Sequence, residues 1–162
     1  MKKLLLLPLF LLPISALADG GGKLAPTAAN PKWQAECSAC HVAYPPTLLP
    51  ERSWRKLMGG LERHFGSDAS LDAATAKEIT AFLASQSADR ASSRTSAKVL
   101  RGIAPGDTPL RITETAWFQR QHDEIRADAW KRPKVGSPAN CAACHAGADQ
   151  GDYAEHKVRI PR

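Results

Sequence analysis

The sequence Cys141-Ala142-Ala143-Cys144-His145 sets two thiols three positions apart, with a histidine directly after the second thiol. A second copy of this arrangement, Cys37-Ser38-Ala39-Cys40-His41, lies upstream, and the two copies use all 4 cysteines of the chain. Such spacing is typical of covalent c-type haem attachment. Each sulfur bonds one vinyl group of the porphyrin, and the histidine then becomes the proximal ligand of the iron. The sequence therefore predicts two covalently attached haem c groups, with attachment residues Cys37, Cys40, Cys141 and Cys144 and proximal ligands His41 and His145.

The N-terminus has the composition of a secretory signal peptide. Met1-Lys2-Lys3 is a positively charged start, residues 4–17 are apolar but interrupted by prolines, and Ala16-Leu17-Ala18 is a small-x-small cleavage site. We expect residues 1–18 to be removed, and the short lysine-rich start suits bacterial export to the periplasm. Because the apolar run is too short to span a bilayer, the mature protein is predicted to be soluble rather than an integral membrane protein.

Two other uses of paired cysteines compete with haem attachment, namely a four-thiolate zinc site and a pair of disulfides. Neither explains the histidines, since the 5 histidines among 162 residues would follow both pairs by chance in roughly 0.1% of cases. An oxidising compartment disfavours a thiolate zinc site. A thioredoxin-like pair would lie between a strand and a helix, a context that this sequence does not provide. Haem attachment is therefore the favoured interpretation.

Composition limits both the core and the partners of the chain. Aromatic residues make up only 6% of the sequence, so two large apolar haems would have to supply much of the interior. The formal charge of +6 falls to about +4 once Lys2 and Lys3 leave with the signal peptide. No basic run interleaved with aromatic residues appears, and this excludes a nucleic-acid partner.

The mature chain divides into segments of different composition. Residues 19–31 are rich in Gly, Ala and Pro and are predicted to form a disordered arm. Residues 32–88 and 103–162 each contain one attachment sequence, and a Ser/Ala-rich segment at 89–102 is the expected linker between them. The predicted fold is mostly α-helical, with two small cytochrome c-like haem units.

The sixth ligand of the first iron has two candidates, His64 and Met58. Apolar residues recur at helical spacing from residue 54 to residue 65, which predicts a helix over 54–65 that ends at Gly66. At about 100° per residue, His64 lies beside the apolar stripe of that helix. Met58 lies on the stripe itself, where a methionine is usually a core residue. His64 is therefore favoured.

The second iron also has two candidates, His122 and His156. A helix is expected over residues 113–130, and His122 shares its inward face with Trp117 and Phe118. His156 stands among charged residues and is expected to be solvated. The favoured distal histidine follows the attachment sequence in the first unit and precedes it in the second. The two units are therefore not sequence repeats.

Several stretches in both halves carry a resemblance to a known family. The first half contributes Trp54-Arg55-Lys56-Leu57-Met58 and His64-Phe65-Gly66, followed by Leu71-Asp72. The second half contributes residues 117–125 and 137–145, Gly151-Asp152-Tyr153 and Ile160-Pro161. Together these stretches extend over nearly the whole mature chain. They resemble the small periplasmic dihaem cytochromes c, the DHC family.

This resemblance implies two bis-histidine haems, with His64 and His122 as the distal ligands. Their positions on the predicted helices agree with that assignment. The resemblance also implies an electron-carrier function. It further implies a monohaem c-type cytochrome that binds oxygen as the electron acceptor, and a membrane cytochrome b as the electron donor.

The number of protein ligands on each haem iron determines which function the sequence predicts. Two protein ligands for each iron leave no position for a substrate, and ligands that are kept on reduction favour electron transfer. The prediction is therefore an electron carrier and not an enzyme. The alternative is a dihaem enzyme or a gas-binding protein, in which one iron opens on reduction. The sequence offers no acid–base pair to serve such an open iron.

Overall fold

The computed structural model describes residues 23–24 and 28–162. The predicted signal peptide lies outside the described residues, as do residues 19–22 and 25–27 of the predicted arm. The described arm residues Lys23 and Leu24 are paired with the C-terminal half. Lys23 forms an isolated bridge with Asp152, the amide of Leu24 donates to the carbonyl of Gly151 over 2.8 Å, and the Leu24 side chain is buried. The order at these two residues differs from the disorder predicted for them.

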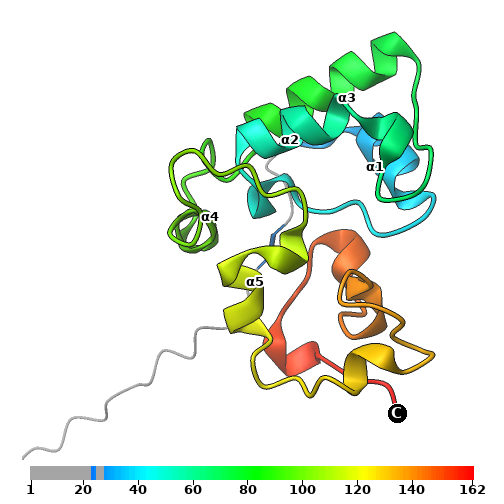
Figure 1. Ribbon diagram of the computed structural model, residues 1–162, viewed down its shortest axis with the longest axis vertical. Coiled ribbons are helices and arrows are strands. Elements are labelled where there is room, and N and C mark those ends of the chain that lie inside the picture. The colour runs from blue at the N-terminus through cyan, green and yellow to red at the C-terminus, as the bar shows by residue number, and fades with distance from the viewer. Residues whose placement is uncertain (1–22, 25–27) are drawn as a thin grey trace, which may run out of the picture.

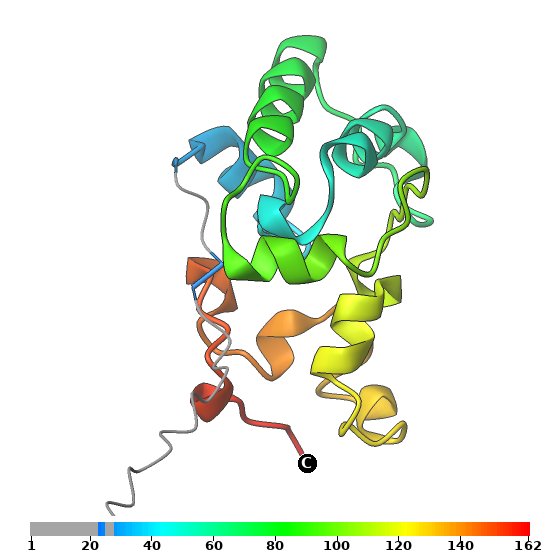
Figure 2. The ribbon, with the colours of Figure 1, turned by 90° about the vertical axis from the view of Figure 1, so that its left-hand side faces the viewer.

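The described residues form a mostly α-helical fold, as predicted, in which the only β-pairs are isolated bridges. None of the helices in this part of the chain has the length and apolar character needed to cross a bilayer. The helices are α1 (Pro31–Ser38), α2 (Glu51–Met58), α3 (Ala73–Ser85), α4 (Arg94–Leu100) and α5 (Ala116–Gln121). The 3-10 turns are η1 (Pro46–Leu48), η2 (Leu61–Arg63), η3 (Ile112–Glu114), η4 (Ala129–Lys131), η5 (Cys141–Ala143), η6 (Ala148–Gln150) and η7 (Glu155–Lys157). Helices α1 to α3 gather at one end of the molecule and α5 lies at the other, with α4 between them (Figures 1 and 2).

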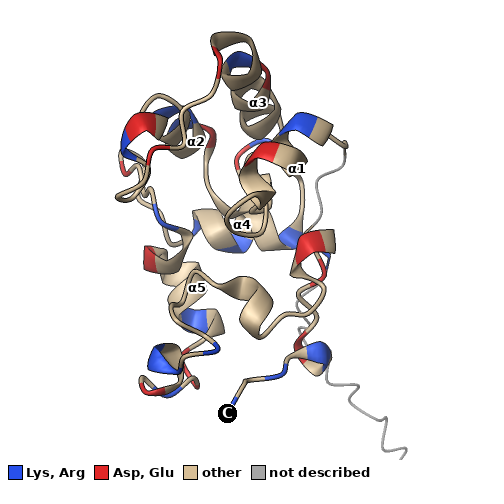
Figure 3. Ribbon diagram, turned by 90° about the vertical axis from the view of Figure 1, so that its right-hand side faces the viewer, with Lys and Arg blue, Asp and Glu red and all other residues tan. Residues whose placement is uncertain are grey.

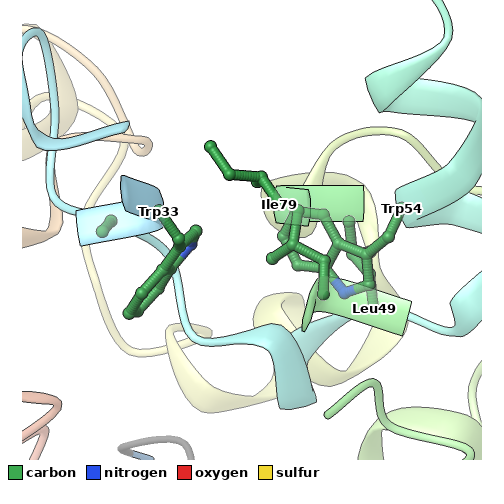
Figure 4. Packing of buried hydrophobic residues seen from close by; sticks show 6 residues of the cluster. Trp33, Leu49, Trp54 and Ile79 are labelled. Atoms are coloured by element: carbon green, nitrogen blue, oxygen red, sulfur yellow. The ribbon is translucent and has the colours of Figure 1, made fainter. Parts of the chain in front are cut away.

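Helices α1, α2 and α3 enclose the core of the N-terminal half. The side chains of Asn30 and Asp72 accept backbone N–H groups at the starts of α1 and α3, and this fixes where the two helices begin. Ile79 of α3 is fully buried, and Figure 4 shows it between Trp33 of α1 and Trp54 of α2. The buried members of this cluster are Trp33, Ala43, Leu49, Trp54, Ile79 and Leu83. This core anchors the elements on either side of the first attachment sequence.

Residues 89–102, predicted to be a linker, contain helix α4. The hydroxyl of Ser93 accepts the amide of Ser96 over 3.0 Å and caps the helix, and Val99 is fully buried in a second core cluster. Helix α4 contacts η1 in the N-terminal half and α5 in the C-terminal half. The segment therefore packs against both halves. A helix of 7 residues with few buried side chains produces no detectable hydrophobic period.

Two predicted helices are wrong in their extent. The helix expected over 54–65 ends at Met58, because Gly59 and Gly60 weaken it and the chain continues into η2. The helix expected over 113–130 is confined to α5. There the imidazole of His122 donates to the carbonyl of Phe118, which would accept the amide of residue 122 if the helix continued. Both predicted distal histidines therefore lie just after a helical element rather than within one.

Charged residues of both signs alternate over the two halves. Figure 3 shows Lys and Arg interspersed with Asp and Glu along the ribbon of the described chain. Glu51, for example, pairs at 2.8 Å with Arg55 of its own helix, α2, and at 2.8 Å with Arg90, which lies after α3. These pairs are exposed and contribute little stability individually.

Candidate functional site

The first candidate site joins His41, which follows α1, to His64, which follows η2. Their ring centroids lie 6.2 Å apart, and the ring planes are inclined by 29°. Nδ1 of His41 donates to the carbonyl of Val42 over 2.7 Å. A histidine whose Nδ1–H is held by a backbone acceptor presents Nε2 as its ligating atom. The structure thus brings together the two residues predicted to ligate the first iron.

A tight turn positions His64. The following residues, Phe65 and Gly66, both have left-handed backbone angles, with φ of 52° and 101°. Glycine adopts this conformation freely, whereas Phe65 does so at a cost in strain. The ring of Phe65 lies 4.9 Å from that of His64, and the guanidinium of Arg111 lies 4.0 Å from the centre of the Phe65 ring. Burial lowers the pKa of His64, with smaller contributions from His41 and Arg111, and this favours the neutral imidazole that ligates metals.

The second candidate site joins His122, which follows α5, to His145, which follows η5. Their ring centroids lie 6.3 Å apart, and the planes are inclined by 84°. Nδ1 of His122 donates to the carbonyl of Phe118 over 2.9 Å, and its ring stacks on Phe118 at 4.1 Å. Burial, and secondarily His122, lowers the pKa of His145. Backbone and aromatic contacts therefore orient His122, whereas Nδ1 of His145 is buried without a hydrogen-bond partner among the described residues.

The separation of the rings tests whether each pair fits a single iron. Imidazole nitrogens bind metals at about 2 Å. With each ring centre about 1 Å beyond its nitrogen, two ligands on opposite sides of one metal have ring centres about 6 Å apart. The observed 6.2 Å and 6.3 Å match this separation. Each histidine pair therefore fits the sixfold coordination of one haem iron.

The four cysteines form no disulfide with one another, and each pair directly precedes a proximal histidine. Burial raises the pKa of Cys37 and of Cys141 to about 11. A bound zinc ion would itself deprotonate its thiol ligands, so the choice between zinc and haem depends on how the candidate ligands are grouped. Among the residues that the structure describes, no three His, Cys, Asp or Glu side chains gather in a metal-binding group. These observations favour thioether attachment over the zinc alternative.

The two alternative ligands lie elsewhere in the structure. Met58 ends α2, where it is partly buried and packs against the core of the N-terminal half. His156 is exposed in η7. Neither residue belongs to one of the two histidine pairs.

Tyr44 is a residue of the site that sequence reasoning missed. Its ring stacks on His41 at 4.5 Å with an interplanar angle of 19°. Its hydroxyl donates to the carbonyl of Ala139 over 2.7 Å, across a sequence separation of 95 residues. Burial raises the pKa of Tyr44 to about 12, so the hydroxyl remains a donor at neutral pH. No local pattern signals such a contact, because its two ends belong to different halves of the chain.

Comparison with known proteins gives one consistent result. A family model for dihaem cytochrome c, DHC, matches residues 33–153. No curated protein matches the chain. A solved diheme cytochrome c from Rhodobacter sphaeroides is 46% identical with a TM-score of 0.72, over 80% of this chain and 100% of that chain. A structure of DHC purified from the same organism is 44% identical with a TM-score of 0.64, over 78% and 98% of the two chains.

The similarity extends to a second organism. The diheme cytochrome type c of Shewanella baltica OS155, sb-DHC, is 38% identical with a TM-score of 0.67, over 82% of this chain and 93% of that chain. The family match includes both attachment sequences and both histidine pairs. The chain therefore belongs to the dihaem cytochrome c family and carries two covalently attached haem c groups.

Proposed function

We propose that the protein is a periplasmic electron carrier in which two histidines close each haem iron. His41 and His64 hold the first iron, and His122 and His145 hold the second. Cys37, Cys40, Cys141 and Cys144 form the thioethers. The observation that carries this proposal is the separation of 6.2 Å and 6.3 Å between the paired imidazole rings. Membership of the dihaem cytochrome c family supports the electron-transfer function.

Haem c, when bound, supplies a one-electron iron couple. The protein orients the iron ligands and influences the potential of this couple. Backbone acceptors at Val42 and Phe118 fix the orientation of His41 and His122. Ligands held in this way move little between oxidation states, and this lowers the reorganisation that accompanies electron transfer. Bis-histidine ligation also biases the couple toward lower potential than histidine–methionine ligation.

The two sites are not equivalent. The imidazole planes are closer to parallel at the first site, at 29°, and nearly perpendicular at the second, at 84°. The relative orientation of axial imidazoles determines the splitting of the iron d orbitals. The two ferric sites are thus expected to give distinguishable electron paramagnetic resonance spectra.

The family resemblance supports the rest of the assignment. Export after removal of residues 1–18 places the carrier in the periplasm. A membrane cytochrome b is the proposed electron donor, and a monohaem c-type cytochrome that binds oxygen is the proposed acceptor.

Carbon monoxide separates this proposal from the alternative of an enzyme or gas-binding protein. We expect the fully reduced protein not to bind carbon monoxide rapidly, because both axial positions of each ferrous iron are occupied by histidine. The measurement is the visible absorption spectrum after mixing with the gas. Rapid formation of a carbonyl complex at either haem would instead establish an iron that opens on reduction, and would support the alternative.

A further inference from the structure

A continuous chain of contacts leads from the first histidine pair to the second attachment sequence. It starts at the ring of His41, on which the ring of Tyr44 stacks at 4.5 Å. The Tyr44 hydroxyl then donates to the carbonyl oxygen of Ala139 over 2.7 Å. The same oxygen accepts the amide N–H of Cys141 over 3.0 Å. One stack and two hydrogen bonds thus connect a proximal ligand of one site to a thioether residue of the other.

We propose that Tyr44 is the positioning residue that couples the two haem sites, by fixing the second attachment sequence against the proximal ligand of the first site. This inference rests on the proposed ligand assignment. With haem bound at both sites, the contacts of Tyr44 would hold the two sites at a fixed separation and would thereby influence the rate of electron transfer between them. One ferrous iron would be oxidised and one ferric iron reduced, and Tyr44 would remain a neutral phenol throughout. No further oxidant or reductant is needed for this transfer.

The aromatic ring and the hydroxyl group of Tyr44 make different contacts. The Tyr44 ring is nearly parallel to the His41 imidazole and restricts its rotation. The hydrogen bond from Nδ1 of His41 to the carbonyl of Val42 restricts the same rotation. The hydroxyl joins the two halves, because its acceptor Ala139 lies two residues before Cys141. A hydrogen bond between partly buried groups holds a fixed geometry that packing alone specifies less well.

The other tyrosine of the chain provides a matched comparison. Tyr153 lies 5.2 Å from the ring of His145, at the second site. Its hydroxyl is buried near Cys141 and Tyr44 and has no hydrogen-bond partner within the described residues. No hydrogen bond of the described residues runs from this hydroxyl to the other half of the chain, whereas the Tyr44 hydroxyl forms one to Ala139.

The test compares Tyr44→Phe, Tyr44→Leu and Tyr153→Phe in the holoprotein with both haems attached. Inter-haem electron transfer is followed after rapid one-electron reduction, and the ferric spectra are recorded by electron paramagnetic resonance. We expect Tyr44→Phe to slow the transfer severalfold, because the variant loses the hydrogen bond that holds the second attachment sequence against Tyr44. It should leave the spectrum of the first site unchanged, because the ring remains. Tyr44→Leu should slow the transfer and also alter that spectrum, whereas Tyr153→Phe should slow the transfer less than Tyr44→Phe does and leave the first-site spectrum unchanged.

The outcomes separate this inference from the proposed function. An unchanged transfer rate in Tyr44→Phe, with both haems attached and bis-histidine spectra intact, overturns the role of Tyr44 but leaves the ligand assignment standing. Equal slowing in Tyr44→Phe and Tyr153→Phe also overturns it, since a general loosening of the fold would then explain both. If Tyr44→Phe loses haem, the spectrum and rate of Tyr44→Leu decide the case: an unaltered first-site spectrum with wild-type transfer contradicts the proposal.

Discussion

Replacing His122 with alanine is expected to open the second iron, so that the reduced variant binds about one carbon monoxide per protein. If His122 is the distal ligand, as proposed, its loss would leave one coordination position of that iron empty. His122 also lines a surface pocket together with Gln119, Ile125 and Trp130, so solvent can reach this position. The measurement is a carbon monoxide titration, followed in the Soret band.

A matched control for this change is His156→Ala. His156 is exposed in η7, and the variant should keep both low-spin spectra and bind no carbon monoxide. Should the His122 variant retain a complete bis-histidine spectrum while the His156 variant loses it, the distal ligand of the second iron is His156 and the assignment of His122 is wrong.

Removal of the second attachment pair is expected to have an equally large effect. The double variant Cys141→Ala, Cys144→Ala should carry about one haem per chain, as counted by the pyridine haemochrome method. The C-terminal half is built largely from 3-10 turns, and its buried side chains include small residues such as Ala129 and Ala148. Without a bound haem to pack against, this half should lose order and become sensitive to proteolysis.

The corresponding change in the first half provides the control. Cys37→Ala, Cys40→Ala should also leave about one haem, but α2 and α3 should resist proteolysis better, because their core includes Leu49, Trp54 and Ile79. Two haems in either double variant, counted by the same method, would contradict the assignment of the attachment residues. Equal proteolysis of the two variants would show that the small core of the C-terminal half is not the weaker one.

The residues of the candidate sites could be predicted from the sequence more accurately than the bounds of the helices that carry them. The attachment spacing predicts His41 and His145 as proximal ligands, and the helical wheels and the family resemblance favour His64 and His122 as distal ligands. The structure brings the rings of each pair to 6.2 Å and 6.3 Å. The helical wheels that placed the distal histidines assumed helices that are too long, and both histidines lie in turns at helix ends. A side chain close to the end of a helix points in nearly the same direction in either case, so the two rings still lie beside the proximal histidines.

Other features depend on contacts that no sequence window contains. Helix α4 is stabilised by burial of Val99 against both halves rather than by its own hydrophobic period. The bond from Tyr44 to Ala139 exists only because the fold brings distant segments together. Leu24 likewise appeared to belong to a low-complexity arm, yet its amide pairs with Gly151. In each case contacts between distant segments determine the structure, and the local composition does not predict these contacts.

The central claim is that two histidines close each iron. Near-infrared magnetic circular dichroism of the fully oxidised, intact protein tests it most directly, because the energy of the ligand-to-iron charge-transfer band identifies the axial ligands. Bis-histidine bands are expected for both haems, with no methionine–iron band. A methionine–iron band would contradict this claim and assign Met58, the one methionine within the described residues, to an iron.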